Sequence, residues 1–330
     1  MNQIKNILRR CNRGDKLNII CTDVHERYQS NLAKTGHNFY SIQIPNLKTW
    51  ERTFAPVPPN YHILDIRKPP LEQLPPWVDF DLALSGHKFG CFQTLKPLAD
   101  RLGIPLISIE HTTAEHLPRQ QVFAARQMVA DVNLFISDYS MNQWGWSKQD
   151  GAKTILHGVD SDTFCPNPLL NKDLDLISVG NDIVNRSHLL GYDIMKEVVK
   201  GLPFKLIGRN PGLSEETKTV EELVNYYQRA KVYLNTSLIS PIPMSMLEAM
   251  SCGLAVVALP TCSIPEIIKQ GVNGVLARNA EEARKYCVHL LQNPLERDRL
   301  GQNARKTIEE KYSLAKFIEN WNEIFARTVK

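Results

Sequence analysis

One segment in the second half of the chain combines residue types that suit the binding of a nucleoside diphosphate. It runs Ser240-Pro-Ile-Pro-Met-Ser-Met-Leu-Glu248 and predicts a loop that opens a helix. Pro243 suits the first helical turn, because its missing N–H is not needed there. The backbone N–H groups and the positive dipole end of such a helix suit a diphosphate. Glu248, one turn further in, suits the ribose hydroxyls. The donor-binding residues predicted here are Pro243, Met244, Ser245, Met246, Leu247 and Glu248.

Other interpretations of the same residues stay open at this point. Ser245 and Glu248 have the spacing of a capping box, in which the glutamate only satisfies backbone donors at the helix start. The side chains of Met244, Met246 and Met250 are apolar and flexible, which favours core packing over a direct functional role.

The elements around this segment predict a parallel sheet. Short apolar runs at 174–179, 204–207, 232–235 and 255–259 alternate with helical patterns at 188–199, 220–230, 243–250 and 265–269. This alternation indicates a sheet covered by helices on both faces. Ligands of such sheets bind beyond the carboxyl ends of the strands. The chemistry is therefore expected in the loops after Val179, Ile207, Asn235 and Leu259.

The first half of the chain predicts a second sheet. Strands are expected at 16–23, 39–44, 61–66, 79–84, 104–110, 132–136 and 154–158, with a helix at about 91–102. The stretch 165–173 is typical of a linker. Residues 1–165 and 166–312 are therefore expected to form two domains, and 313–330 to form a C-terminal helix whose apolar stripe includes Trp321, Ile324 and Phe325.

Composition narrows the class of protein. The chain has 330 residues, a net charge of +4, and hydrophobic and charged shares of 43% and 22%, which are values of an ordinary globular protein. No apolar run approaches the roughly 18 residues of a membrane span, and the first residues lack the apolar middle of a signal peptide. Seven scattered cysteines without CxxC spacing argue against a disulfide framework or a zinc site and favour the cytoplasm. The clustered basic residues near the start suit either a solvated helix or contact with an anionic membrane or nucleic acid: Lys5, Arg9, Arg10 and Arg13.

Taken together, four further segments and the one at 240–248 resemble the family-4 glycosyltransferases of GT-B architecture, also called glycosyl transferases group 1. Residues 153–166 resemble the family's I-P-N-G-V-D-x-x-x-F-x-P segment, and 176–181 its F-V-G-R strand. Residues 221–237 resemble the helix, strand and loop before its signature, and 264–276 the stretch after it.

The resemblance implies an α/β fold of two Rossmann-like domains facing across a cleft. The C-terminal domain would bind the nucleotide sugar, the N-terminal domain would bind the acceptor, and the final helix would pack back on the N-terminal domain. It also implies transfer with retention and without a metal or other cofactor.

The resemblance also implies roles for residues of this chain that stand at the family's site positions. Glu248 matches the second glutamate of the family's Glu-x7-Glu, whereas Ser240 stands at the first. In the loops of the C-terminal half, Gly180 and Asn181 follow the first strand, with Asn181 at the usual arginine. Arg186 stands at or near the usual lysine, and Arg209 is a further candidate for the diphosphate.

In the first half, His111 follows a strand where the family has a histidine, so that it is expected to bind a sugar hydroxyl or the accepting oxygen. His87 and Lys88, in another strand-end loop, are candidates for acceptor contact. The residues predicted to be catalytic are His111, Arg186 and Glu248.

These predictions describe a cytoplasmic, retaining, metal-independent glycosyltransferase. Its donor would be a UDP- or GDP-type sugar, and its acceptor a saccharide, a lipid-linked sugar or another hydroxyl, with peripheral membrane contact as an option. Front-face attack is expected, with the leaving diphosphate helping to deprotonate the acceptor. The alternatives are transfer to modified bases of DNA, a catalytically degenerate module that only binds a nucleotide sugar, and an epimerase or phosphorylase of the same architecture.

Overall fold

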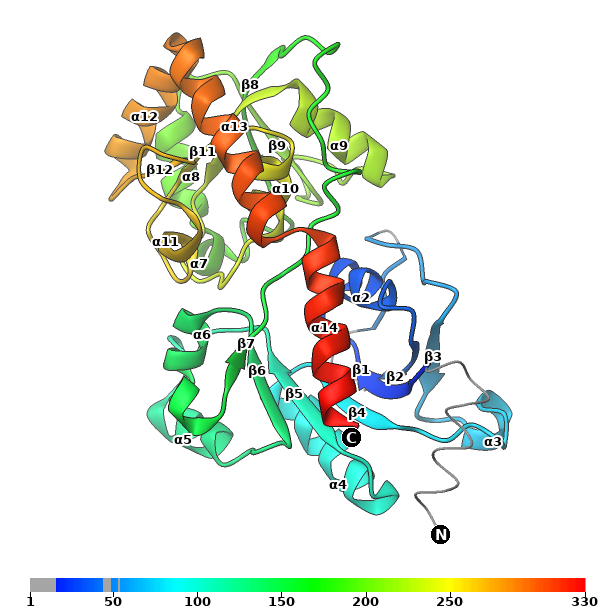
Figure 1. Ribbon diagram of the computed structural model, residues 1–330. Helices are drawn as coiled ribbons and strands as arrows, with labels where there is room; N and C mark the ends of the chain where they lie inside the picture. The colour runs from blue at the N-terminus through cyan, green and yellow to red at the C-terminus, as the bar shows by residue number, and fades with distance from the viewer. Residues whose placement is uncertain (1–15, 44–48, 53, 330) are drawn as a thin grey trace. The chain divides into compact units, whose positions relative to one another are not determined.

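The computed structural model describes residues 16–43, 49–52 and 54–329, which form two α/β units. One unit holds the described residues up to Ile136, Met141–Ile155 and those from Ile318 on. The other holds Ser137–Ser140 and Leu156–Phe317. Each unit is built on its own sheet (Figure 1). The four basic residues near the start, Lys5, Arg9, Arg10 and Arg13, lie outside the described residues.

The sheet of the first unit has seven strands in the order β3-β2-β1-β4-β5-β6-β7, and each neighbouring pair is parallel. Because all strands point the same way, their carboxyl ends meet at one edge, where ligands of such sheets bind. The strands are β1 Asn18–Thr22, β2 Asn38–Gln43, β3 Tyr61–Asp65, β4 Leu82–Ser85, β5 Leu106–Glu110, β6 Val132–Phe135 and β7 Lys153–Thr154.

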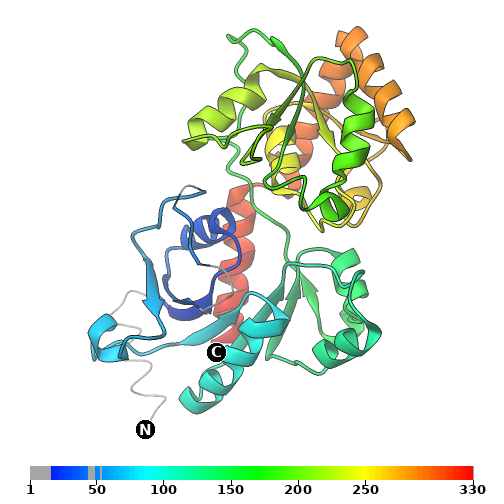
Figure 2. The same cartoon turned by 180° about the vertical axis from the view of Figure 1, so that it is seen from behind.

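Helices cover both faces of this sheet. They are α2 Glu26–Ala33, α3 Pro70–Gln73, α4 Gln93–Leu102, α5 Arg119–Arg126, α6 Asp138–Gln143 and α14 Leu314–Thr328, of which α6 and α14 are shared with the second unit. Figure 1 shows α14 in front of the strands, and Figure 2, from behind, shows α4 in front of them. Buried side chains of α4, among them Leu95 and Ala99, pack on Ile20 and Ala83 of the strands.

The sheet of the second unit has five parallel strands in the order β12-β11-β10-β8-β9. They are β8 Leu174–Val179, β9 Phe204–Ile207, β10 Ala230–Asn235, β11 Ala255–Ala258 and β12 Val275–Leu276. The helices are α7 Ser187–Leu190, α8 Tyr192–Val199, α9 Val220–Arg229, α10 Met244–Ser251, α11 Ile264–Ile267, α12 Ala280–Gln292 and α13 Pro294–Lys311. The predicted alternation of strand and helix is present, with element ends that differ by a few residues.

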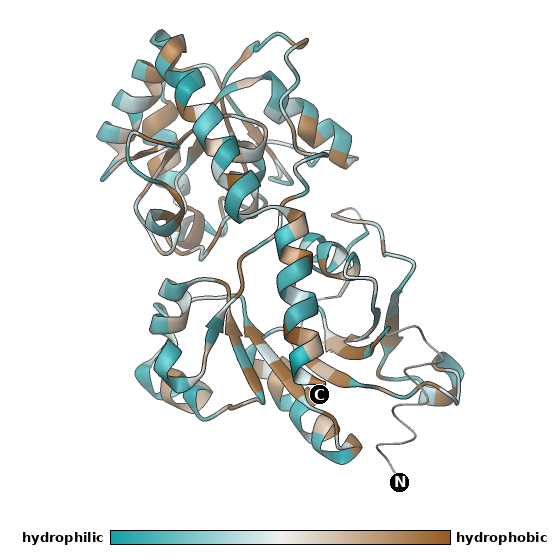
Figure 3. Ribbon diagram, in the orientation of Figure 1, coloured by the Kyte–Doolittle hydropathy of each residue, from teal (hydrophilic) through white to brown (hydrophobic). Residues whose placement is uncertain are grey.

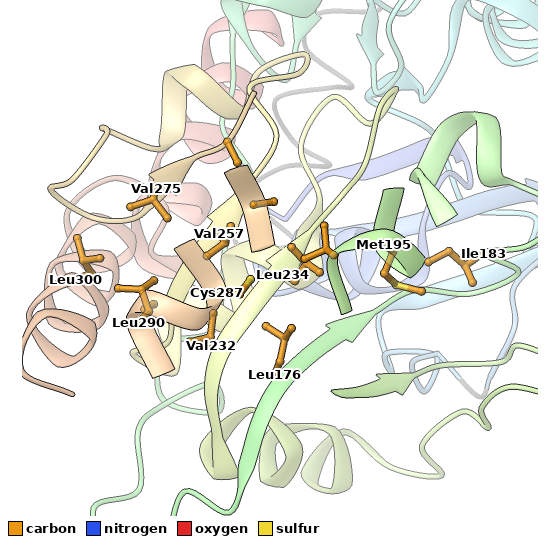
Figure 4. Packing of buried hydrophobic residues seen from close by; sticks show 14 residues of the cluster. Leu176, Ile183, Met195, Val232, Leu234, Val257, Val275, Cys287, Leu290 and Leu300 are labelled. Carbon is orange, nitrogen blue, oxygen red and sulfur yellow. The ribbon is translucent and has the colours of Figure 1, made fainter. Parts of the chain in front are cut away.

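The core of the second unit lies between its sheet and helices α8, α12 and α13 (Figure 4). Leu176, Val232 and Val257 of the strands face Met195 of α8 and Leu290 of α12. Central strands such as β4 and β11 are mostly apolar along their length (Figure 3), as expected for strands that are buried on both faces. Within the described ranges, no helix combines the length and the apolar character that crossing a bilayer requires.

The helix expected at 188–199 is instead two helices, α7 and α8, because Gly191 interrupts it. Gly191 has a φ of +67°, in the left-handed region that favours glycine. It also lies so close to the loop after β10 that a Cβ would stand 2.0 Å from the carbonyl oxygen of Thr236. The interruption therefore lets the α7–α8 turn pack directly against that loop.

This packing gives a test with a matched control. Gly191→Ala places a methyl group against the Thr236 carbonyl and forces alanine into a left-handed conformation, so we expect it to lower the free energy of unfolding by about 2–4 kcal/mol. Gly201→Ala has a similar φ of +70° but nothing within 4 Å of its Cβ, and should cost only about 1–2 kcal/mol. Urea unfolding of both variants measures the difference; equal losses would contradict the close approach to Thr236.

Candidate functional site

The loops after β8 and β9 are locked together by the buried carboxamide of Asn210. Its Oδ1 accepts the backbone N–H of Ile183 at 2.9 Å. Its Nδ2 donates to the carbonyl oxygens of Gly180 and Gly208 at 2.8 and 3.1 Å and lies 2.8 Å from Ser214 Oγ. One side chain thus satisfies backbone groups of both loops and fixes their spacing.

Asn181 and Arg209, both predicted to bind the donor, take part in the same hydrogen-bonded contact between the loops. Asn181 Oδ1 accepts the backbone N–H of Arg209 at 2.8 Å, and the N–H of Asp182 donates to the carbonyl of Arg209 at 3.0 Å. Gly208, with a φ of +124°, allows this contact, because a Cβ there would stand 2.3 Å from the Gly180 carbonyl oxygen. The oxygen of Asn181 therefore shapes the loop that presents Arg209, whose side chain is exposed.

Helix α10 begins beside these loops. Tyr233 O–H donates to Ser245 Oγ at 2.8 Å, and Ser245 Oγ donates to the carbonyl of Val179, the last residue of β8, at 3.3 Å. The first turn of α10 is thereby tied to the strand that leads into Gly180. The backbone N–H groups of Met244 and Ser245 have no acceptor among the residues that the structure describes, so they retain the donor capacity of a helix start.

Glu248 lies in the second turn of α10 and is buried, with 2% of its surface exposed. Tyr227 of α9, also buried, donates its O–H to Glu248 Oε2 at 3.0 Å. The carboxylate is therefore held from the side of α9, and its orientation depends on that tyrosine.

The capping-box interpretation of Ser245 and Glu248 is wrong. Pro243 is the N-cap and makes no side-chain cap hydrogen bond, while Ser245 bonds to Tyr233 and Val179 instead. The side chains of Met246, Leu247 and Met250 are buried in the core, so that a donor contact by Met246 or Leu247 could involve only their backbone.

The loop after β10 brings Ser240 toward the same region. The N–H groups of Leu238 and Ile239 both donate to the carbonyl of Leu189 in α7, at 2.8 and 3.0 Å. Arg186 is the N-cap of α7 and its side chain is exposed, with no ion pair among the described residues. Ser240 is half-buried. Hydrogen bonds therefore connect the loops that carry Gly180, Arg186, Arg209 and Ser240 with the start of α10.

In the first unit, the predicted residues gather around a carboxylate that the sequence did not single out. Glu110, the last residue of β5, is buried and accepts four hydrogen bonds at 2.8–3.0 Å. The donors are His87 Nδ1, the backbone N–H of Lys88, and the N–H and O–H of Thr112. Glu110 therefore fixes the loops after β4 and β5 to one another.

Lys88 is buried inside this unit and does not present its ammonium to a ligand. Its Nζ donates to the carbonyl of Met128 at 2.7 Å and to Asn133 Oδ1 at 3.0 Å. It also lies 5.1 Å from the ring centroid of Trp146. Because the ammonium of Lys88 is bonded to Met128 and Asn133, Lys88 is not among the proposed acceptor contacts. His87, by contrast, keeps 29% of its side chain exposed.

His111 is held between aromatic rings. Tyr28 of α2 packs against it edge-on, with ring centroids 4.4 Å apart, and the His87 ring lies 6.0 Å away. Trp321 of α14 donates its indole N–H to Tyr28 Oη at 3.2 Å. The structure thus brings His87 and His111 together, and the C-terminal helix supports the residue that positions His111.

The segment around α10 is similar to a known protein family. Residues 215–307 match the family model described as glycosyl transferases group 1. This segment of the chain is therefore similar to the group 1 glycosyltransferases. The family resemblance predicted from the sequence is confirmed by this match, which includes Tyr227, Ser245 and Glu248.

Relatives and solved structures agree with this assignment. A Methanocaldococcus jannaschii protein named uncharacterized glycosyltransferase MJ1069 is 30% identical over 112 residues, covering 33% of this chain and only 29% of its own length. A second protein from that organism, uncharacterized glycosyltransferase MJ1178, is 24% identical over 272 residues, or 74% of this chain and 75% of its own. The crystal structure of Anabaena Alr3699/HepE in complex with UDP and glucose matches 94% of this chain and 99% of that one, with a TM-score of 0.76 at 14% identity. This likeness shows the GT-B fold, so the predicted fold class is confirmed.

Sequence reasoning missed three residues that organise the site: Asn210, Glu110 and Tyr227. Asn210 and Glu110 each stand at the carboxyl end of a strand, and a polar residue at that position is itself a signal. Tyr227 is hidden in an ordinary amphipathic helix, and nothing in the spacing links it to Glu248. The individual roles predicted for the site residues and the division of roles between domains stay predictions.

The burial of Lys88 predicts a pH dependence of stability. Burial lowers the pKa of Lys88 from 10.5 to about 8, so the folded protein binds fewer protons than the unfolded chain between these values. Stability should therefore rise as the pH increases from 8 to 10.5. Relative to Lys88→Met, which has no such group, wild type should gain about 2–3 kcal/mol of unfolding free energy across that window. Urea unfolding of both proteins at pH 7.5 and pH 10.5 measures this gain, and a constant difference would contradict a buried ammonium.

Proposed function

We propose that the protein is a retaining glycosyltransferase that takes a sugar from a nucleoside-diphosphate donor, without a metal, and passes it to a saccharide or lipid-linked hydroxyl acceptor. The observation that carries this proposal is the match of residues 215–307 with the group 1 glycosyltransferases. That segment contains α9, β10 and α10, and with them the helix start and the buried glutamate that suit a nucleotide.

The second unit offers the groups that a diphosphate needs. The unpaired N–H groups at the start of α10 and the exposed Arg186 and Arg209 supply hydrogen-bond donors and positive charge. Preorganised donors of this kind stabilise the charge that builds on a leaving group, and one such donor contributes about 3 kcal/mol. Because Asn210 fixes the loops beforehand, little reorganisation is needed when the diphosphate departs.

The donor is proposed to be a UDP-sugar in the first place. Support comes from Alr3699/HepE, which shares the fold and was crystallised with UDP and glucose. Glu248 would accept the ribose hydroxyls, and Tyr227 would hold its carboxylate in place. The acceptor contact is assigned to His87 and His111 of the first unit.

A nucleotide-sugar-binding module without transfer activity is the alternative that one observation favours. Ser240 stands where the family has a glutamate, and the oxygen of Asn181, at the usual arginine, is bonded to the protein backbone. Both changes remove charge from the donor region. Release of UDP from UDP-sugars, with and without glycoside acceptors, separates a module that only binds from an enzyme.

The first test of the donor site concerns Glu248. Glu248→Ala should raise the Kd for UDP by about tenfold or more, because a hydrogen bond to a charged group contributes about 1.5–3 kcal/mol. Glu248→Gln keeps an acceptor for Tyr227 and separates the loss of charge from the loss of packing. Isothermal titration calorimetry measures both variants.

The matched control is Glu197→Ala, an exposed glutamate on α8, which should bind UDP as wild type does. An unchanged Kd in a folded Glu248→Ala protein would remove the ribose contact from the proposal.

The second test concerns stereochemistry and metal. Transfer should survive excess EDTA, and proton NMR should show the donor's anomeric configuration in the product. The motivation is that Asp173-Leu-Asp175, an Asp-x-Asp pair of the second unit, lies at the start of β8, away from the ligand edge. Both aspartates are ion-paired, with Arg229 and Lys231, so they are committed to the protein. Activity lost with EDTA and restored by manganese, or an inverted product, would overturn the proposed mechanism.

A further inference from the structure

The carboxylate of Glu110 gives His87 a defined chemical state. Burial alone would raise the pKa of Glu110, but the neighbouring His87 and the hydrogen bonds from His87, Lys88 and Thr112 outweigh burial, so that the pKa lies below its ordinary value. The geometry shows the same state directly: the backbone N–H groups of Lys88 and Thr112 can only donate, and they reach Oε2 and Oε1 of Glu110, so that both oxygens accept as in an ionised carboxylate.

This fixes the tautomer of His87. Since Glu110 Oε1 lies 3.0 Å from His87 Nδ1 and only accepts, a neutral His87 carries its proton on Nδ1. Its Nε2 then holds a lone pair, the arrangement that a general base requires.

The surroundings hold His87 in one orientation. Two of the four donors to Glu110 come from Thr112 and one from the backbone of Lys88, so the carboxylate cannot follow His87 if the imidazole moves. His111 stands beside it, with ring planes at 79°. Ser85 Oγ donates to the carbonyl of His87 at 2.9 Å and fixes the backbone as well.

We propose that His87 binds the acceptor's hydroxyl through Nε2 and takes its proton during transfer, and that Glu110 is the residue that positions His87. This inference rests on the proposed function. It assigns the proton to a side chain of the first unit, whereas the sequence favoured the leaving diphosphate.

The acceptor oxygen forms a bond to the anomeric carbon of the sugar, and the bond from that carbon to the diphosphate oxygen breaks, with its electron pair leaving on the nucleoside diphosphate. The hydroxyl proton moves to His87 Nε2. The resulting imidazolium keeps its hydrogen bond to Glu110 and returns its proton to water after product release.

The experiment compares His87→Asn with wild type. The asparagine amide can still donate to Glu110 but has no basic nitrogen. The probes are UDP-glucose, UDP-N-acetylglucosamine and GDP-mannose as donors, and water and octyl glucoside as acceptors; the pair that wild type turns over fastest is used. We expect kcat to fall about 10²–10⁴-fold, as for loss of a general base, with KM for the donor within twofold. Free imidazole should restore part of the activity of His87→Ala.

Two further variants test whether the loss of activity is specific to His87 and its contact with Glu110. His116→Asn changes an exposed histidine six residues after Glu110, and should keep wild-type kcat. Glu110→Gln should lower kcat at least tenfold with the Kd for UDP unchanged. Should Glu110→Gln not fold, ¹⁵N NMR of histidine-labelled wild type reports the same contact, with the His87 proton expected on Nδ1.

The outcomes separate this inference from the function on which it rests. A wild-type protein that neither binds UDP nor releases nucleotide from any of the donors contradicts the proposed function. A wild type that turns over, with His87→Asn retaining kcat within threefold, overturns only the role of His87. A loss confined to the KM for the acceptor, or a His87 proton on Nε2, overturns it as well.

Discussion

Buried polar side chains at or just beyond the carboxyl ends of the strands are the constraint on which the loops of each unit depend. The backbone groups of tightly packed loops need partners there, because an unpaired buried group costs about 1–3 kcal/mol. Asn210 meets this need in the second unit and Glu110 in the first. Each is a single side chain that contacts two loops. The same bonds that satisfy the backbone therefore also hold the functional loops at fixed spacing.

The chemical difference between these two side chains suits the tasks that are proposed for their units. Asn210 is neutral, so that it organises the loops around Arg186 and Arg209 without opposing their positive charge or repelling a diphosphate. Glu110 is a carboxylate that lies 3.0 Å from His87 Nδ1, so that it orients the imidazole. A carboxylate in place of Asn210 would oppose the positive charge that Arg186 and Arg209 bring to these loops, and an amide in place of Glu110 would leave the tautomer of His87 undetermined.

Much of the fold could be predicted from the sequence, because apolar runs and helical periodicity follow from burial alone. The parallel sheets, and α10 to within a residue, are examples. The predictions that differ from the structure depended on contacts between residues that are distant in the sequence. Gly191 splits a continuous amphipathic pattern because it meets Thr236, and Ser245 bonds to Tyr233 rather than capping its helix. Lys88 stands in a strand-end loop typical of ligand contact, yet its side chain turns inward to Met128 and Asn133. The spacing of residues along the chain does not predict these contacts, because their partners are distant in the sequence.

Helix α14 contacts a residue that packs against His111, although the helix lies far from the strand-end loops in the sequence. Trp321 of α14 bonds to Tyr28, and Tyr28 packs edge-on against His111. Phe325, one turn later, lies against His37 and Phe39 of the first unit. The core of the first unit thus combines residues that precede the second unit in the sequence with residues that follow it. Because Tyr28 is fully buried between Trp321 and His111, the position of His111 depends on the packing of α14. Helix α14 therefore supports His111, a proposed acceptor contact, although the helix contains none of the residues that the strand-end pattern selects.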